Sequence, residues 1–117
     1  MGLDSIWVFD NEDAHHPKFD PPLRLVGGVF SCHGKYSFRG KVYSEMIEHI
    51  TGSSLYQEEI PNEEIVEMSK KLSSFEMTEE LWGEFRYYES QDISQFKDIV
   101  RMFKTYGDAG ANLIGWW

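Results

Sequence analysis

The sequence has one cysteine, Cys32, and no long run of apolar residues. A single cysteine cannot close an internal disulfide, which excludes a disulfide-stabilised secreted scaffold and favours a reducing compartment. The apolar runs are far shorter than the ~20 residues that a helix needs to cross a bilayer, and the N-terminus lacks the basic and apolar pattern of a secretory leader. We therefore expect a cytoplasmic protein without a membrane partner.

Basic residues are also scarce, because 11 Lys and Arg stand against 20 Asp and Glu and give a formal net charge of -9. A surface this negative repels nucleic-acid phosphates, so duplex nucleic acid is not expected as a partner. The length of 117 residues is typical of one domain, which we expect to span residues 1–117. Homo-oligomerisation stays open, because an interface has the same apolar pattern as a core.

Carboxylates are absent from residues 23–43, which contain four basic side chains and four of the ten glycines. Glycines allow a close backbone approach to a ligand, and free N–H groups at the start of the helix expected next favour phosphate or carboxylate. The leading hypothesis is therefore a non-enzymatic protein that binds a small anionic ligand, such as a nucleotide or a phosphorylated metabolite. The expected ligand-binding residues are Gly27, Gly28, Ser31, His33, Lys35, Arg39 and Lys41.

Two other interpretations of the charge pattern stay open. The basic stretch has neither the Walker A spacing nor the Gly-x-Gly-x-x-Gly fingerprint, so it can equally be a hairpin whose bases pair with acidic helices. The acidic helices from Ser44 onward can instead serve an interaction module or inhibitor of a basic partner. The aromatic residues between positions 82 and 88 favour a core face over an exposed partner surface.

A small enzyme that uses Cys32, a histidine or a bound metal is the third function considered. His33 follows Cys32 directly, and neighbours on an extended chain point to opposite faces, so His33 is poorly placed to activate the thiol. No pair of residues has the Cys-x-x-Cys or His-x-x-x-His spacing of a metal site. We therefore assign no catalytic residue, metal or cofactor, although one loop offers potential metal ligands at Asp10, Asp13, His15, His16 and Asp20.

The strands are expected near the N-terminus. Leu3–Phe9 is rich in β-branched and aromatic residues and predicts the first strand. Residues 10–22 contain three of the four prolines and predict a loop. A second strand is expected over Leu23–Phe30, interrupted by Gly27-Gly28, with a turn or loop over residues 31–37.

Helices are expected in the remainder of the chain, where apolar residues recur at helical spacing over residues 39–51, 62–75, 78–88 and 92–106. Gly52 and Gly107 are expected to end the first and last helices, and Asn62 to cap the second. The C-terminal Trp116-Trp117 pair is expected to be packed, because Trp buries ~150 to 250 Å² when packed, and this tail is a candidate strand beside Leu3–Phe9. The fold class is therefore α+β, with a small antiparallel sheet packed with three to four helices.

Three short phrases resemble parts of known sequences. Met-Gly-Leu-Asp at the start, Ser-Phe-Arg-Gly-Lys-Val-Tyr at residues 37–43 and Gly-Trp-Trp at residues 115–117 resemble pieces of small uncharacterised proteins of bacteria and their phages. The resemblance implies a bacterial or phage source, and the host cytoplasm if the protein is phage-encoded. It implies no reaction and no site residue.

Overall fold

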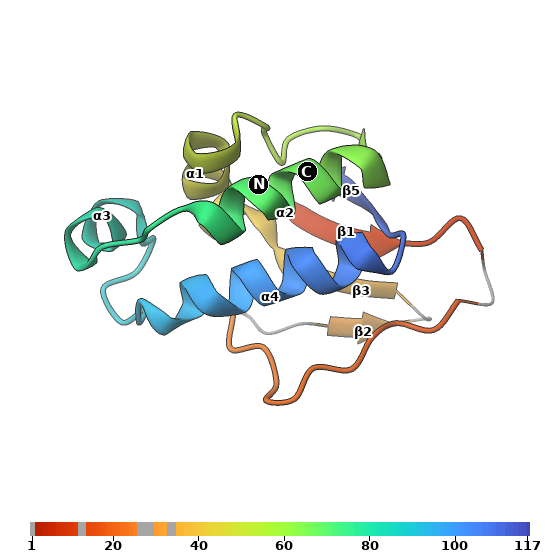
Figure 1. Ribbon diagram of the computed structural model, residues 1–117, viewed down its shortest axis with the longest axis horizontal. Helices are drawn as coiled ribbons and strands as arrows, with labels where there is room; N and C mark the ends of the chain where they lie inside the picture. Colours follow the sequence, from red (N-terminus) through yellow and green to blue (C-terminus); the bar gives the residue numbers. More distant parts are fainter. Residues whose placement is uncertain (1, 12–13, 26–29, 33–34) are drawn as a thin grey trace.

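The computed structural model describes residues 2–11, 14–25, 30–32 and 35–117, and it has the expected α+β class (Figure 1). Within these residues, one antiparallel sheet has the strand order β2-β3-β1-β5-β4. The strands are β1 (Asp4–Val8), β2 (Phe30–Cys32), β3 (Lys35–Arg39), β4 (Glu59–Ile60) and β5 (Asn112–Trp116). The helices are α1 (Gly40–Thr51), α2 (Asn62–Ser74), α3 (Glu79–Phe85) and α4 (Ser94–Asp108).

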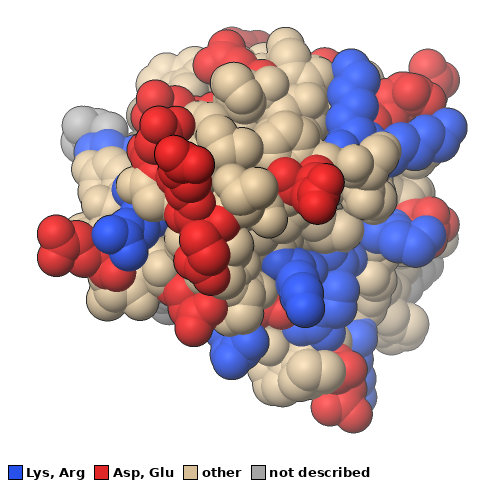
Figure 2. All heavy atoms as spheres, turned by 60° about the vertical axis from the view of Figure 1, so that its left-hand side comes forward, with Lys and Arg blue, Asp and Glu red and all other residues tan. Residues whose placement is uncertain are grey.

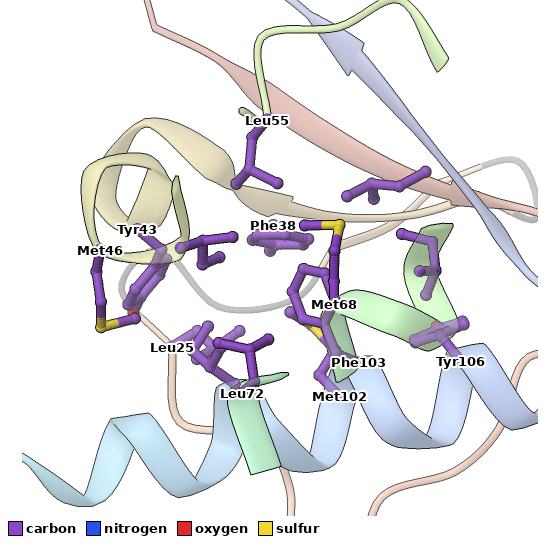
Figure 3. Packing of buried hydrophobic residues seen from close by; sticks show 14 of the residues in the cluster. Leu25, Phe38, Tyr43, Met46, Leu55, Met68, Leu72, Met102, Phe103 and Tyr106 are labelled. Atoms are coloured by element: carbon purple, nitrogen blue, oxygen red, sulfur yellow. The ribbon is translucent and has the colours of Figure 1, made fainter. Parts of the chain in front are cut away.

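The helices α1, α2 and α4 cover one face of the sheet, and α3 lies at one end of the molecule beside α1 (Figure 1). The strand β1 shows why that face is covered, since its side chains alternate between the two faces and Ser5 and Trp7 are buried towards the helices. The Trp7 ring stacks on Tyr106 of α4, with ring centroids 4.4 Å apart. Figure 3 shows the same layer of buried side chains, with Phe38 of β3 close to Met68 and Phe103 of the helices.

The C-terminal tail forms β5, which pairs with β1 along its whole length, from Asp4 opposite Trp116 to Val8 opposite Asn112. This pairing confirms the strand expected beside the first one. The expectation that the terminal tryptophans are packed is wrong, because Trp116 is 69% exposed and Trp117 is 52% exposed. Alternation explains Trp116: Leu113 faces the helices, so a residue three positions further on faces away from them.

The prediction of a strand over Leu23–Phe30 is also wrong for the first residues of that range. Residues 23–25 form no strand, and residues 26–29 lie outside the described residues. The strand β2, Phe30–Cys32, pairs with β3 where a loop was expected. The backbone N–H of Arg24 donates instead to the Asp98 carboxylate of α4, at 3.0 Å. This bond holds the segment against a helix rather than against the sheet.

Candidate functional site

The structure describes the side chains of only two of the expected ligand-binding residues. Gly27, Gly28 and His33 lie outside the described residues. The pairing of β2 with β3 places Ser31 opposite Tyr36 and Lys35 opposite Cys32. Arg39 ends β3, and Lys41 lies in the first turn of α1. Both of these side chains are exposed.

The start of α1 packs against β1. Gly40 is buried there, and a Cβ at its position would meet the side chain of Leu3 at 3.0 Å. The backbone N–H of Lys41 donates to the carbonyl oxygen of Leu3, at 3.2 Å. This N–H group is therefore engaged by the first strand, which removes one of the donors that the anion hypothesis assigned to a ligand.

The exposed large apolar side chains of the described residues form two groups, which together we call the aromatic strip. Monomeric surfaces rarely expose several large aromatic side chains side by side, so such a group indicates a binding surface. The strip comprises Tyr56, Tyr87, Tyr88, Trp116 and Trp117, each of them more than 40% exposed.

One half of the strip lies at the end of the sheet. The rings of Tyr56 and Trp117 meet edge to face, with centroids 5.6 Å apart. Next to them, a cavity of about 380 Å³ is lined by Gly2, Asp4, Arg39 and the two tryptophans. Asp4 is the cross-strand partner of both Arg39 and Trp116, so these three side chains stand in one row on the sheet face that is turned away from the helices.

Lys41 joins this half to the two tyrosines that follow α3. Its Nζ lies 5.8 Å from the centre of the Tyr87 ring, and its Cδ lies 3.9 Å from the position of a Cβ built on Gly2. Tyr87 and Tyr88 meet edge to face at 4.9 Å. Lys41 therefore lies between the two groups of the strip.

Gln91 fixes the backbone that carries the two tyrosines. Its Oε1 accepts hydrogen bonds from the N–H groups of Tyr87 at 2.8 Å and Tyr88 at 2.7 Å. Its carbonyl oxygen accepts the indole N–H of the buried Trp82, at 2.9 Å. A site presented on a fixed backbone loses less conformational entropy when it binds, so this turn suits recognition.

The tryptophan end is held by the edge of the sheet. The N–H of Gly115 donates to the carbonyl oxygen of Gln57 at 3.1 Å, which holds the segment that carries Tyr56 against β5. The Gln57 side chain donates to the carbonyl oxygen of Ser54, at 2.7 Å. Both ends of the aromatic strip therefore rest on hydrogen-bonded backbone.

Exposed carboxylates belong to residues that are close in sequence or in strand pairing to the members of the strip. They are Asp4 beside Trp116, Glu58 and Glu59 after Tyr56, and Glu84 and Glu89 on either side of the tyrosine pair. None of the five forms an ion pair in the part of the chain that the structure describes. Figure 2 shows acidic side chains in a row over the end of the molecule that lies at the left of Figure 1, with basic side chains on both sides of the row.

Sequence reasoning favoured a core position for Tyr87 and Tyr88 and a packed position for Trp116 and Trp117, and it made no prediction for Tyr56. Trp82 is indeed buried, but Tyr87 and Tyr88 are exposed because α3 ends at Phe85. The sequence indicates this exposure through the polar run Glu89-Ser90-Gln91-Asp92 directly after the tyrosines, because such a run is typical of a surface turn. For Trp116, the exposure is indicated by the alternation of side chains between the two faces of a strand. If Leu113 is buried, Trp116 lies on the opposite face.

Neither metal chemistry nor known relatives supply a further indication. Among the described residues, no group of three or more His, Cys, Asp or Glu side chains is arranged to hold a metal ion. None of the helices that the structure describes is both long enough and apolar enough to span a membrane. Comparison of the chain with known proteins gives no match, whether to a family model, to a curated protein or to a solved structure.

Proposed function

We propose that the protein is a non-enzymatic interaction module whose aromatic strip binds a basic segment of a partner protein. The observation that carries this proposal is the exposure of five large aromatic side chains in two groups, with Lys41 between them. Trp and Tyr dominate the binding energy of protein interfaces, because they bury a large rigid area with few rotatable bonds.

The charge around the strip supports a basic partner. The flanking carboxylates attract Lys and Arg, and the exposed indole faces favour cationic groups by cation–π interaction. The overall charge of -9 repels acidic partners and accelerates the approach of basic ones. Arg39 and Lys41 lie beside members of the strip and supply hydrogen-bond donors for the backbone carbonyls or carboxylates of the same partner.

A selection of random peptides displayed on a surface tests the proposal without knowledge of the natural partner. Peptides that bind the wild-type protein are expected to combine Lys or Arg with apolar residues. The change Trp116→Ala is expected to weaken their binding by about 30-fold or more. Truncating a central interface tryptophan costs roughly 2 kcal/mol of binding free energy, which corresponds to this factor. The affinities are measured by isothermal titration calorimetry.

Matched acidic variants separate the flanking carboxylates from general charge. The double change Glu59→Gln with Glu84→Gln is expected to weaken peptide binding and to reduce its salt dependence. The change Asp108→Asn, at the far end of α4, also removes negative charge and is expected to leave binding nearly unchanged. Selected peptides that are acidic, or that bind the Trp116→Ala variant as tightly as wild type, would contradict the proposal.

A small anionic ligand, such as a nucleotide, remains the second candidate. The cavity beside Arg39 favours it, because Arg39 forms no ion pair within the described residues and the neighbouring indoles could stack on a base. Asp4 in the same cavity opposes it.

If this second candidate is correct, ADP binds the wild-type protein, and the double change Arg39→Ala with Lys41→Ala lowers its affinity by about ten-fold or more. Equal affinity for the two proteins, or no binding of ADP by the wild type, rejects the candidate. Calorimetry with ADP and with adenosine, which lacks the phosphates, provides the measurement and its control.

A further inference from the structure

A second pocket, of about 430 Å³, lies between the proline-rich loop, β3 and α4 and shares no residue with the aromatic strip. This volume is in the range of small-molecule sites. The polar residues that line it are Lys18, Tyr36 and Tyr106. Its apolar walls are formed by Pro17, Phe19, Pro22 and Leu23.

The loop that forms the walls is held against α4 by several contacts. The Asp98 carboxylate accepts the backbone N–H of Arg24 at 3.0 Å and also binds the Arg101 guanidinium at 2.9 Å. The Arg101 guanidinium in turn lies over the Phe19 ring, 5.9 Å from its centre. The buried Asp98 therefore fixes both the loop and the cation that supports one wall.

An aromatic cluster forms the back of the pocket. The His16 ring stacks on Tyr36, with centroids 4.0 Å apart, and its Nδ1 lies 3.1 Å from the Tyr106 hydroxyl. Burial raises the pKa of the Tyr106 phenol well above its ordinary value, and the nearby Tyr36 raises it further. The Tyr106 hydroxyl therefore keeps its proton at neutral pH and remains a hydrogen-bonding group.

The charge of the pocket is opposite to that of the protein. Among the described residues that line it, Lys18 is the charged one and none is a carboxylate, although the chain has 20 acidic residues. Lys18 is exposed and forms no ion pair within the described residues. A ligand carboxylate at the rim would therefore meet a cation, with no competing acid among the described residues that line the pocket.

We infer that this pocket binds a small carboxylic acid with a flat apolar body. The body lies among Phe19, Tyr36 and the prolines, and the carboxylate pairs with the Lys18 ammonium. Aromatic rings favour stacked or edge-to-face contacts, which a flat body can make with the Phe19 and Tyr36 rings. The inference does not depend on the interaction proposed for the aromatic strip.

Benzoate and benzamide test this inference, because they have nearly the same shape and differ in charge. In a ¹H–¹⁵N NMR titration of the full chain, benzoate is expected to bind with a dissociation constant of about 1–10 mM. It should perturb the amides of residues 18, 19, 36 and 106, and bind at least about five-fold more tightly than benzamide, since a partly exposed charge pair contributes modestly.

The variant Lys18→Gln is expected to remove the preference for benzoate and to leave benzamide binding unchanged. The matched variant Lys97→Gln, on the exposed face of α4, should leave both affinities as in wild type. The inference is overturned if benzoate and benzamide bind with equal affinity, or if the Lys18→Gln variant keeps the preference for benzoate. It is also overturned if benzoate, at a concentration about 20-fold above the upper limit of the expected dissociation constant, perturbs none of these amides.

Discussion

Replacing Trp7 with alanine is expected to lower the free energy of unfolding by about 3–5 kcal/mol, the usual cost of truncating a buried tryptophan. Trp7 is 0% exposed and stands between the sheet and α4. Its ring meets Phe103 edge to face at 5.2 Å and Phe38 at 6.0 Å, in addition to the stack on Tyr106. Alanine would remove all of these contacts at once and leave a cavity that the rigid layers on both sides cannot close.

The variant Trp7→Phe serves as the matched control. The indole Nε1 of Trp7 is buried, and no hydrogen-bond acceptor is found for it within the described residues. Phenylalanine removes this unsatisfied donor and keeps most of the aromatic contacts, so a loss of only about 1–2 kcal/mol is expected. Urea unfolding monitored by circular dichroism measures both variants, and a Phe variant that is as unstable as the Ala variant would contradict this description of the core.

Replacing Gly115 with alanine is expected to lower the free energy of unfolding by about 2 kcal/mol or more, because the new methyl group has no room. A Cβ at this position would lie 2.5 Å from the carbonyl oxygen of Gln57 and 2.7 Å from that of Leu55. Both obstacles are backbone atoms, so the segment that carries Tyr56 would have to move away from β5. The same movement would separate Tyr56 from Trp117 and disturb the aromatic strip.

Gly83 provides a control in which alanine is expected to change the free energy of unfolding in the opposite direction. It lies inside α3, and a Cβ at its position would meet nothing within 4 Å. Alanine there is expected to stabilise the protein by about 0.5–1 kcal/mol, because glycine is a poor helix former. Thermal unfolding of the two alanine variants gives the comparison, and a Gly115→Ala variant as stable as wild type would show that the loop does not approach β5 as described.

The elements with a strong local signal were predictable from the sequence. The β-branched and aromatic run at residues 3–9 predicted β1, and the apolar spacing of residues 39–51 predicted α1, with Gly52 adopting the left-handed conformation after it at φ 78°. The tail was correctly predicted as a strand beside β1. In each case the local pattern and the tertiary environment favour the same structure.

Other predictions were wrong where tertiary contacts override the local pattern. Gly107 was expected to end α4, yet it lies inside the helix, where α4 approaches Ile65 and Val66 of α2. Gly110 takes the left-handed conformation instead, at φ 84°. Asn62 was expected as a cap, but its side-chain amide donates to the carbonyl oxygens of Gly107 and Ala111, which join two distant parts of the chain.

The candidate site was less predictable than the fold. The charge of the basic stretch stands out along the sequence, and two of its residues, Arg39 and Lys41, lie beside members of the aromatic strip. The strip itself combines Tyr56, Tyr87 and Trp116, which are far apart in the chain. The pairing of β5 with β1 positions Trp116, and the hydrogen bonds of Gln91 position the turn that carries Tyr87. No local sequence pattern predicts such a surface, because the sequence does not distinguish an exposed aromatic residue from a buried one.

The indole N–H signals of the four tryptophans provide the most direct test of the aromatic strip as the binding surface. Trp7 and Trp82 are buried, and Trp116 and Trp117 are exposed. When a basic peptide selected on the wild-type protein is added to ¹⁵N-labelled protein, the signals of Trp116 and Trp117 are expected to shift or broaden, while those of Trp7 and Trp82 stay in place. Saturation with such a peptide while the Trp116 and Trp117 signals remain unchanged would contradict the assignment of this surface.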